Sequence, residues 1–190
     1  EGLNGNVAPI LPQTIGARPF DGLSQTAADM RDVLKGSYLW NVDATRPLQD
    51  PLSYRVTVYG LSEARRAVKD LNDQIAVQIN STDDNPATIL NADEAYRSES
   101  TQVANYFVEG NGVKGAIIPS GNFNPLPVAL ALQRTSIAMA HLSHYSVQRT
   151  VHLSYDQFTG LTRFLTDPSN KGHAFGAIQK SFMGLHVGNM

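Results

Sequence analysis

Two long stretches of helix-like hydrophobic periodicity most constrain what this chain can fold into. In the first, from about Ser53 to Asn80, apolar residues recur every three or four positions and charged residues fill the other face. Asn85-Pro86 stops any continuation, because proline lacks the amide hydrogen that a helix interior requires. We expect one long amphipathic helix here. Its apolar positions are Val58, Leu61, Ala64, Val68, Leu71, Ile75 and Ile79.

The second stretch runs from about Pro127 to Leu153, and Pro127 stands where the first turn of a helix tolerates proline. Alanines flank its apolar stripe, and small residues let two helices approach closely, as in a helical bundle. The pattern therefore predicts a mostly α fold, a long-helix bundle. The stripe consists of Val128, Leu132, Thr135, Met139, Leu142 and Ser146.

The remaining chain predicts shorter elements within what we interpret as a single domain, residues 1–190. Ser24–Leu34 favours a short helix with Ala27, Met30 and Leu34 on one face and Gly36 as its stop. The first twenty residues suggest an irregular segment, and residues 39–51 a loop. Residues 87–119 suggest a loop with short extended pieces. A short helix is expected near Ala174–Leu185.

Composition excludes several classes of protein. Apolar residues make up 42% and charged residues 17%, which excludes a disordered tail and suggests surface hidden by a partner or by further parts of the chain. The net charge of −2, without a basic run, argues against nucleic-acid binding. With no cysteine, membrane span or signal peptide in the sequence, we expect a cytoplasmic protein. Because the chain starts at Glu1, we expect a processed chain or an internal piece.

The histidines do not form a recognisable metal site. His141 and His144 are three residues apart on the second helix, and His152 follows two turns later. No acidic residue accompanies them at ligand spacing and no HExxH motif occurs, so we interpret them as helix-surface or interface residues and expect no metal. A GxSxG elbow is also absent.

Two loops carry candidate chemistry. The segment from Arg46 to Arg55 places a glutamine, an aspartate, a tyrosine and an arginine at the mouth of the first long helix. Arginine can hold a carboxylate through two parallel hydrogen bonds, and a helix N-terminus favours an anion. The segment from Ser120 to Pro125 puts Phe123 on a glycine-permitted bend. Loop packing and helix capping also explain both segments, so the residues alone indicate a helical domain with a candidate carboxylate-binding loop.

Three motifs, in this order, resemble one enzyme family. QDPLSYR (Gln49–Arg55) is similar to a QDxYSLR motif, INSTDDNP (Ile79–Pro86) to an NSxTDNP segment, and SGNFNPLPVALAL (Ser120–Leu132) to an SGGNFHGxPVA turn and the helix after it. EGLNGN at the start and SFMGLH near the end add weaker matches. The chain thus resembles the MIO-dependent aromatic amino acid ammonia-lyases, of which the histidine and phenylalanine enzymes are members, over nearly its whole length.

The resemblance implies a central helical-bundle segment of a longer chain with the fumarase/aspartase-like all-α fold, assembled as a homotetramer. Such enzymes eliminate ammonia from an aromatic L-amino acid to give an α,β-unsaturated acid. Their electrophile is MIO (4-methylideneimidazol-5-one), formed from an internal Ala-Ser-Gly. Residues from three subunits build each site. The expected partners are therefore the rest of the polypeptide, further copies of the chain and a small aromatic amino acid, not nucleic acid or a membrane.

The resemblance also assigns roles to individual residues. Arg55 corresponds to the arginine that binds the substrate carboxylate. Gln49 corresponds to the glutamine near the MIO group, and Phe123 to the phenylalanine packed beside it. Asn122 is expected to shape the turn. A permanent cation in a partly dry pocket suits the role given to Arg55.

Departures from the family pattern lie in the same motifs. Leu52 stands where the family has a tyrosine with its hydroxyl in the site, and Tyr54, two positions later, would point elsewhere on a helix. Like Asn122, both are expected to support the loop of the site. Asn124 replaces a histidine. The Ala-Ser-Gly triplet does not occur among the 190 residues, so this chain alone would not form MIO.

Three functions therefore follow from the sequence. The first is a piece of an ammonia-lyase, with histidine favoured over tyrosine and phenylalanine because NSTDDNP and SGNF look closer to bacterial histidine enzymes. The second is an aminomutase on the same scaffold. The third is a catalytically inactive structural or regulatory relative, which Leu52 and Asn124 suggest.

Overall fold

The computed structural model describes residues 1–153, 155–160, 162 and 169, which are mostly helical with one small sheet. The chain divides into two compact units. Unit 1 contains residues 1–68 and the described residues from 134 onward, and unit 2 contains residues 69–133. The interpretation as a single domain stays a prediction. The helix expected near Ala174–Leu185 and the SFMGLH segment lie outside the described residues.

The N-terminal part of unit 1 is more regular than expected. It forms the 3-10 helix η1 (Ala8–Ile10) and the helix α1 (Pro12–Gly16) within the segment predicted to be irregular, followed by α2 (Leu23–Val33). The reason is burial, because these short elements place apolar side chains in one core with the start of α4. That core consists of Ile10, Ile15, Leu23, Ala27 and Val58.

Helix α2 confirms the predicted short helix. Ala27 is fully buried, and Met30 and Leu34 pack against the core, as their spacing on one face predicts. Gly36 adopts a left-handed backbone conformation (φ +79°) just beyond the helix end, which glycine adopts readily because it has no Cβ. The 3-10 helix η2 (Tyr38–Trp40) and a loop then lead to the QDPLSYR motif.

The first long helix is interrupted near its start. A four-residue helix α3 (Leu52–Arg55) is separated by Val56 from α4 (Thr57–Ile79). The Ser53 carbonyl accepts hydrogen bonds from the Thr57 hydroxyl (2.7 Å) and from Arg149 Nη1 (3.3 Å). These side-chain bonds compete with the backbone ladder at the break. The predicted helix from about Ser53 to Asn80 is therefore two helices.

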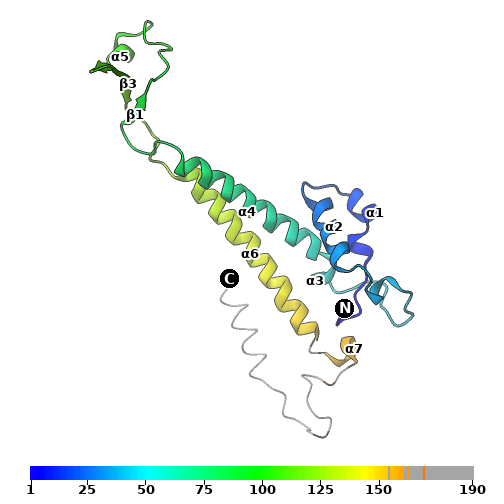
Figure 1. The fold of residues 1–190 in the computed structure, drawn as a ribbon. Coiled ribbons are helices and arrows are strands. Elements are labelled where there is room, and N and C mark those ends of the chain that lie inside the picture. The colour runs from blue at the N-terminus through cyan, green and yellow to red at the C-terminus, as the bar shows by residue number, and fades with distance from the viewer. Residues whose placement is uncertain (154, 161, 163–168, 170–190) are drawn as a thin grey trace. The chain divides into compact units, whose positions relative to one another are not determined.

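The second predicted helix is confirmed as α6 (Leu126–Leu153). Within unit 1 it packs antiparallel against α4 (Figure 1). Gly60 of α4 faces Tyr145 and Leu142 so closely that an added Cβ would lie 2.6 Å from the Tyr145 ring. Further along, the Thr135 hydroxyl donates to the Ala67 carbonyl at 3.2 Å. Close contact at the small residues Gly60 and Ala67 of α4 thus joins the two helices, whereas the close approach expected from the alanines of α6 stays a prediction.

The predicted stripe on α6 contacts α4 through only some of its members. Leu132, Met139 and Ser146 are exposed, whereas Thr135, Leu142 and Tyr145 provide the contacts with α4. Helix α6 is apolar on more than one side, with Leu130 and Ile137 also exposed. A periodic pattern does not say which of two apolar faces meets a given neighbour.

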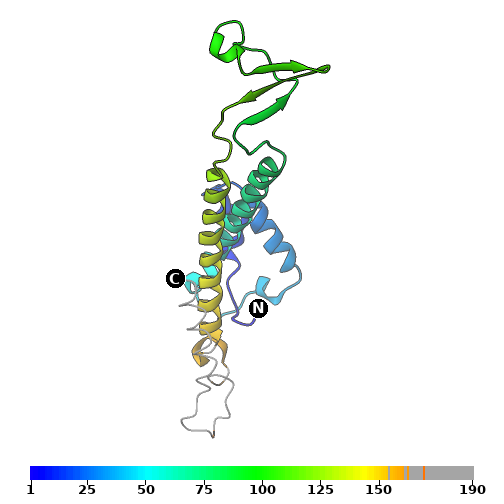
Figure 2. The same ribbon diagram turned by 90° about the vertical axis from the view of Figure 1, so that its left-hand side faces the viewer.

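Unit 2 contains a three-stranded antiparallel sheet (Figure 2). Strands β1 (Ala87–Leu90) and β2 (Phe107–Gly110) both pair with the central β3 (Val113–Ile118). The short extended pieces expected within residues 87–119 rested on the apolar runs Thr88–Leu90 and Ala116–Ile118, which lie in β1 and β3, whereas β2 was missed. The sequence Asn111-Gly112, with both φ angles positive, makes the tight β2–β3 turn. Two further single-turn helices are α5 (Thr101–Ala104), in unit 2, and α7 (Asp156–Thr159), in unit 1.

In the part of the chain that the structure describes, no helix combines the length and the apolar character needed to cross a membrane.

The contact at Gly60 predicts a specific effect on stability. Gly60→Ala forces the Tyr145 ring to move, and we expect a loss of about 1–3 kcal/mol in the free energy of unfolding of the full-length protein. Gly16→Ala is the matched control, since no atom lies within 4 Å of its added Cβ. Thermal denaturation measures both. Equal melting temperatures for the two variants would contradict the close packing of α4 and α6.

Candidate active site

A polar network fastens the N-terminal segment to the motif loop (residues 43–51). Asn4 donates to Asp43 Oδ2 at 2.6 Å, and its amide oxygen accepts from Arg46 Nε and Nη2 at 3.2 and 3.0 Å. The backbone N–H of Asn6 donates to Asp50 Oδ2 at 2.6 Å. Hydrogen bonds from Thr45 come first among the causes that lower the pKa of Asp43 to about 2. The loop is therefore held by residues some forty positions away in sequence.

Gln49 and Arg55, predicted from the family motif, do lie together. Arg55 Nη1 donates to Gln49 Oε1 at 3.1 Å, from the last turn of α3 to the loop before it. Arg55 Nε is buried, and it has no hydrogen-bond partner among the residues that the structure describes. Both side chains line a cavity of about 500 Å³, here called the arginine pocket. Its walls are Asn6, Ala8, Pro9, Thr14, Leu48, Gln49, Asp50, Arg55 and Tyr59.

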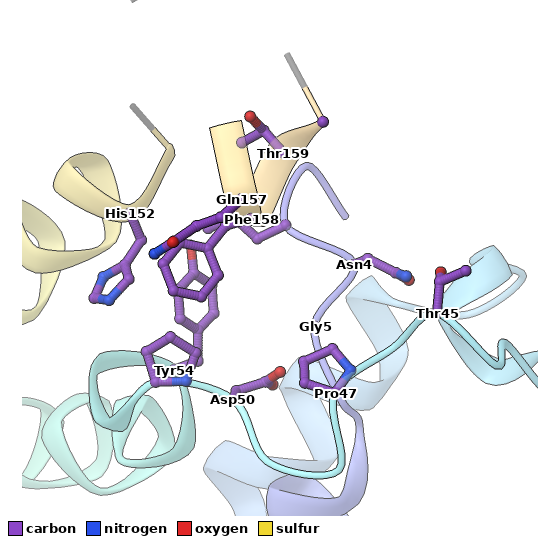
Figure 3. A pocket seen from close by; sticks show the side chains of 13 residues that line it. Asn4, Gly5, Thr45, Pro47, Asp50, Tyr54, His152, Gln157, Phe158 and Thr159 are labelled. Carbon is purple, nitrogen blue, oxygen red and sulfur yellow. The ribbon is translucent and has the colours of Figure 1, made fainter. Parts of the chain in front are cut away.

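A second cavity of similar volume, about 500 Å³, lies in the same unit and is here called the aromatic cavity. Figure 3 shows Tyr54, Phe158 and His152 around it, with Asp50 beside Gly5 and Pro47. Tyr54 points here and not into the arginine pocket, as its place on the helix predicts. Leu52 lines neither cavity and is 65% exposed. The expectation that Leu52 supports the site loop stays a prediction.

Asp50 lines both cavities and is only 7% exposed. Burial raises the pKa of its carboxyl group, although the hydrogen bond from Asn6 and the charges of Arg46 and Arg55 act in the opposite direction. Burial likewise raises the pKa of the Tyr54 hydroxyl, and the Asp50 charge adds to this shift against the opposing charge of Arg149. Desolvation is therefore the main cause of the raised pKa values of Asp50, which lines both cavities, and of Tyr54, which lines the aromatic cavity.

Phe123 and Asn122 belong to unit 2, in the turn before α6. Asn122 donates to the Thr82 carbonyl at 3.2 Å, and Ser120 N donates to Asn85 Oδ1 at 2.8 Å. The structure thus joins the INSTDDNP and SGNFN motifs side to side. Asn122 holds the turn, as expected, while the Phe123 side chain is 62% exposed.

Asn124, which stands where the related motif has a histidine, has a structural contact. Its side-chain oxygen accepts the backbone N–H of Leu126, the first residue of α6, at 3.1 Å. Asparagine is well suited to this position just before the helix, because its short side chain can accept the N–H two residues on in an Asx turn. The replacement of the family's histidine by Asn124 therefore suits the start of α6.

Sequence reasoning missed the residues that complete the cavities from distant segments. Asn6 and Tyr59 line the arginine pocket, and His152 and Phe158 line the aromatic cavity. No local motif marks them, because only the tertiary contacts bring them to the loop. The expectation that no metal binds stays a prediction, and the described residues contain no group of three or more His, Asp or Glu placed to hold one.

Comparison with known proteins gives the family. The sequence model described as aromatic amino acid lyase matches residues 1–189. Histidine ammonia-lyases of Sorangium cellulosum and Anaeromyxobacter dehalogenans are 31% and 30% identical over 97% of this chain and 33% of theirs. This chain belongs to the aromatic amino acid lyase family. It spans about a third of the length of these relatives.

Solved structures agree. The ergothioneine-degrading enzyme ergothionase from Treponema denticola, in complex with desmethyl-ergothioneine sulfonic acid, matches with a TM-score of 0.77 and 32% identity, over 99% of this chain and 33% of that one. Phenylalanine aminomutase from Pantoea agglomerans matches with a TM-score of 0.70 over 100% of this chain and 37% of that one. Its 19% identity shows the fold alone.

The burial of Asp50 predicts opposite effects for two substitutions. Asp50→Ala leaves the Asn6 N–H without its acceptor and should cost about 1–3 kcal/mol of unfolding free energy. Asp50→Asn keeps an acceptor oxygen and removes the buried charge, so its melting temperature at pH 7 should equal or exceed that of the wild type.

The pH dependence follows from the same shift. A raised pKa in the folded state means that stability from this group is present at low pH and is lost as the pH rises through that pKa. The advantage of Asp50→Asn should therefore shrink as the pH falls toward about 4. An advantage that instead grows on acidification would show that the carboxylate is stabilised by its surroundings.

Proposed function

We propose that this chain is the carboxylate-binding part of an ammonia-lyase that eliminates ammonia from an aromatic L-amino acid. The observation that carries the proposal is the arginine pocket. There a permanent cation has a buried, unpartnered Nε–H among the described residues and a second nitrogen held by Gln49. A substrate carboxylate would satisfy that N–H and gain a charge-assisted hydrogen bond. The family membership of the chain supports the same function.

The orientation of Arg55 is what this chain contributes to catalysis. The bond to Gln49 fixes the guanidinium at the end of α3, and burial of its Nε lowers the competition from water. A substrate carboxylate held by Arg55 would fix the position of the α and β carbons of the substrate relative to the pocket. Holding a substrate in one orientation removes part of the entropic barrier to the reaction.

The resemblance implies MIO, formed from residues beyond this chain. Two described residues fit a neighbouring electrophilic ring. The Gln49 amide keeps its N–H donors, since its bond to Arg55 uses only the oxygen, and the Phe123 side chain is exposed on its turn. The resemblance assigns each of them a place beside the group. When present, MIO would supply an electrophilic centre that activates the amino group of the substrate for departure.

Burial within unit 2 supports a larger assembly, which we propose to be a homotetramer. Among residues 69–133, all of which the structure describes, the buried apolar residues are the alanines Ala87, Ala116 and Ala131. Large apolar side chains of this unit are exposed to solvent, for example Ile79 (75% exposed) and Leu90 (69% exposed). The remaining polypeptide and neighbouring subunits would bury them in a long-helix bundle. A cytoplasmic location also stays a prediction.

Histidine is the substrate that we propose first, since histidine ammonia-lyases are 30–31% identical to this chain. A second candidate is elimination of a tertiary amine from a betaine such as ergothioneine, whose amino group carries three methyl groups. The match to ergothionase and the leucine at position 52, where the family motif has a hydroxyl group, favour it. An aminomutase and an inactive relative are the remaining alternatives.

An ultraviolet assay on the full-length protein tests these functions. We expect new absorbance from a conjugated acid, with release of ammonia, when L-histidine, L-tyrosine or L-phenylalanine is supplied. Release of trimethylamine from ergothioneine would select the second candidate, and formation of a β-amino acid would select the aminomutase. A folded full-length protein that converts none of these substrates would contradict the proposal.

Arg55→Lys tests the carboxylate role. Lysine keeps the charge but loses the fork of N–H donors, so kcat/KM should fall about 30-fold to 100-fold, mainly through a higher KM. Arg65→Lys is the matched control. Its exposed salt bridge to Asp29 contributes little, and its kinetic constants should stay within about twofold. A wild-type KM in Arg55→Lys would exclude carboxylate binding by Arg55.

A further inference from the structure

The aromatic cavity has walls that suit a flat ring, and its volume leaves room for such a guest. Its volume of about 500 Å³ falls in the range of small-molecule pockets. Three aromatic side chains line it, namely Tyr54, His152 and Phe158. The rings of His152 and Phe158 meet edge to face, with centroids 5.0 Å apart. Aromatic walls of this kind favour a planar aromatic guest by stacking and edge contacts.

Two polar side chains of the cavity, Asp50 and His152, offer acceptors. Asp50 is 7% exposed, and the hydrogen bond from Asn6 to its Oδ2 leaves further lone pairs on the carboxylate. His152 Nδ1 lies 2.7 Å from the Gln148 carbonyl, which can only accept, so Nδ1 carries the proton. In the neutral ring Nε2 is then an acceptor. A guest with an N–H or O–H donor would match these groups.

The charges around the cavity argue against a simple cation as its ligand. The positive charges of Arg46 and Arg55 lower the pKa of Asp50, and the positive charge of Arg149 lowers the pKa of Tyr54, in each case against the larger effect of burial. These three positive charges oppose the attraction that a lone buried carboxylate would exert on a cation. A neutral guest avoids this opposition and still satisfies the acceptors.

We propose that the aromatic cavity is a second small-molecule site, which binds a neutral, single-ring heteroaromatic compound carrying an N–H donor. Tyr54 builds this site because of its place in the motif. It stands where the QDxYSLR pattern has a leucine, and the pattern's tyrosine position holds Leu52. The exchange of the two residue types supplies the cavity with a ring and a hydroxyl group. The proposal does not depend on the lyase activity.

Pyrazole and 1-methylpyrazole test the proposal as a matched pair, because both are neutral at pH 7 and only pyrazole has an N–H. Ligand-observed NMR titration of the full-length protein should give saturable binding of pyrazole, with a dissociation constant on the order of 1 mM for so small a ring. The methylated ring should bind about threefold to tenfold more weakly, the loss expected for one hydrogen bond.

Four variants locate the binding. Tyr54→Leu removes a wall of the cavity, and Gly5→Val fills space beside Asp50 and Tyr54, so each should weaken pyrazole binding about tenfold or more. Gln49→Ala in the arginine pocket and Tyr96→Leu on the exposed surface of unit 2 should leave it unchanged. Circular dichroism confirms that each variant is folded.

Two results would overturn the proposal. One is the absence of saturable pyrazole binding to the wild-type protein. The other is binding that survives both Tyr54→Leu and Gly5→Val, or that is lost in Gln49→Ala alone, which would place the ring in the arginine pocket. A failure of lyase activity leaves these binding measurements unaffected, so the two proposals are judged separately.

Discussion

The close packing of α4 against α6 is the contact on which the rest of unit 1 depends. Gly60 lets the Tyr145 ring approach the α4 backbone. Further along, the Thr135 hydroxyl of α6 donates a hydrogen bond to the Ala67 carbonyl of α4. The same alignment brings Arg149 to the Ser53 carbonyl and the Thr57 hydroxyl, at the break between α3 and α4. That break ends α3 at Arg55. The direction of the arginine is therefore tied to a helix pairing that lies outside its own motif.

Around this pairing, hydrogen bonds across long sequence separations shape the site. Asn4 and Asn6 fasten the motif loop, and Asp50 forms a common wall of the two cavities. A buried carboxylate costs free energy unless its lone pairs accept hydrogen bonds. The hydrogen bond that the Asn6 N–H donates to Asp50 at 2.6 Å offsets only part of that cost. The remaining acceptor capacity of Asp50 and the Nε of Arg55, which has no partner among the described residues, both suit ligands with complementary polar groups.

The sequence predicts this architecture where periodicity or a motif acts locally. Helices α2, α4 and α6 follow from apolar spacing, and the Gln49–Arg55 pair follows from the family resemblance. The break at Val56 was not predictable, because its cause includes Arg149, almost a hundred residues away. Likewise, His152 and Phe158 reach the aromatic cavity only through the course of α6 and α7. Which members of the α6 stripe meet α4 was not predictable either, since that helix has more than one apolar side and Leu132 and Met139 stay exposed.

The central claim is that Arg55 receives the carboxylate of an aromatic amino acid. A crystal structure of the full-length protein with the conjugated acid that its reaction would form tests this most directly. We predict a carboxylate oxygen within about 3 Å of Arg55 Nε, with the bond between Arg55 and Gln49 retained. A carboxylate bound at another cation, with Arg55 Nε turned to an acceptor of the protein itself, would contradict the account.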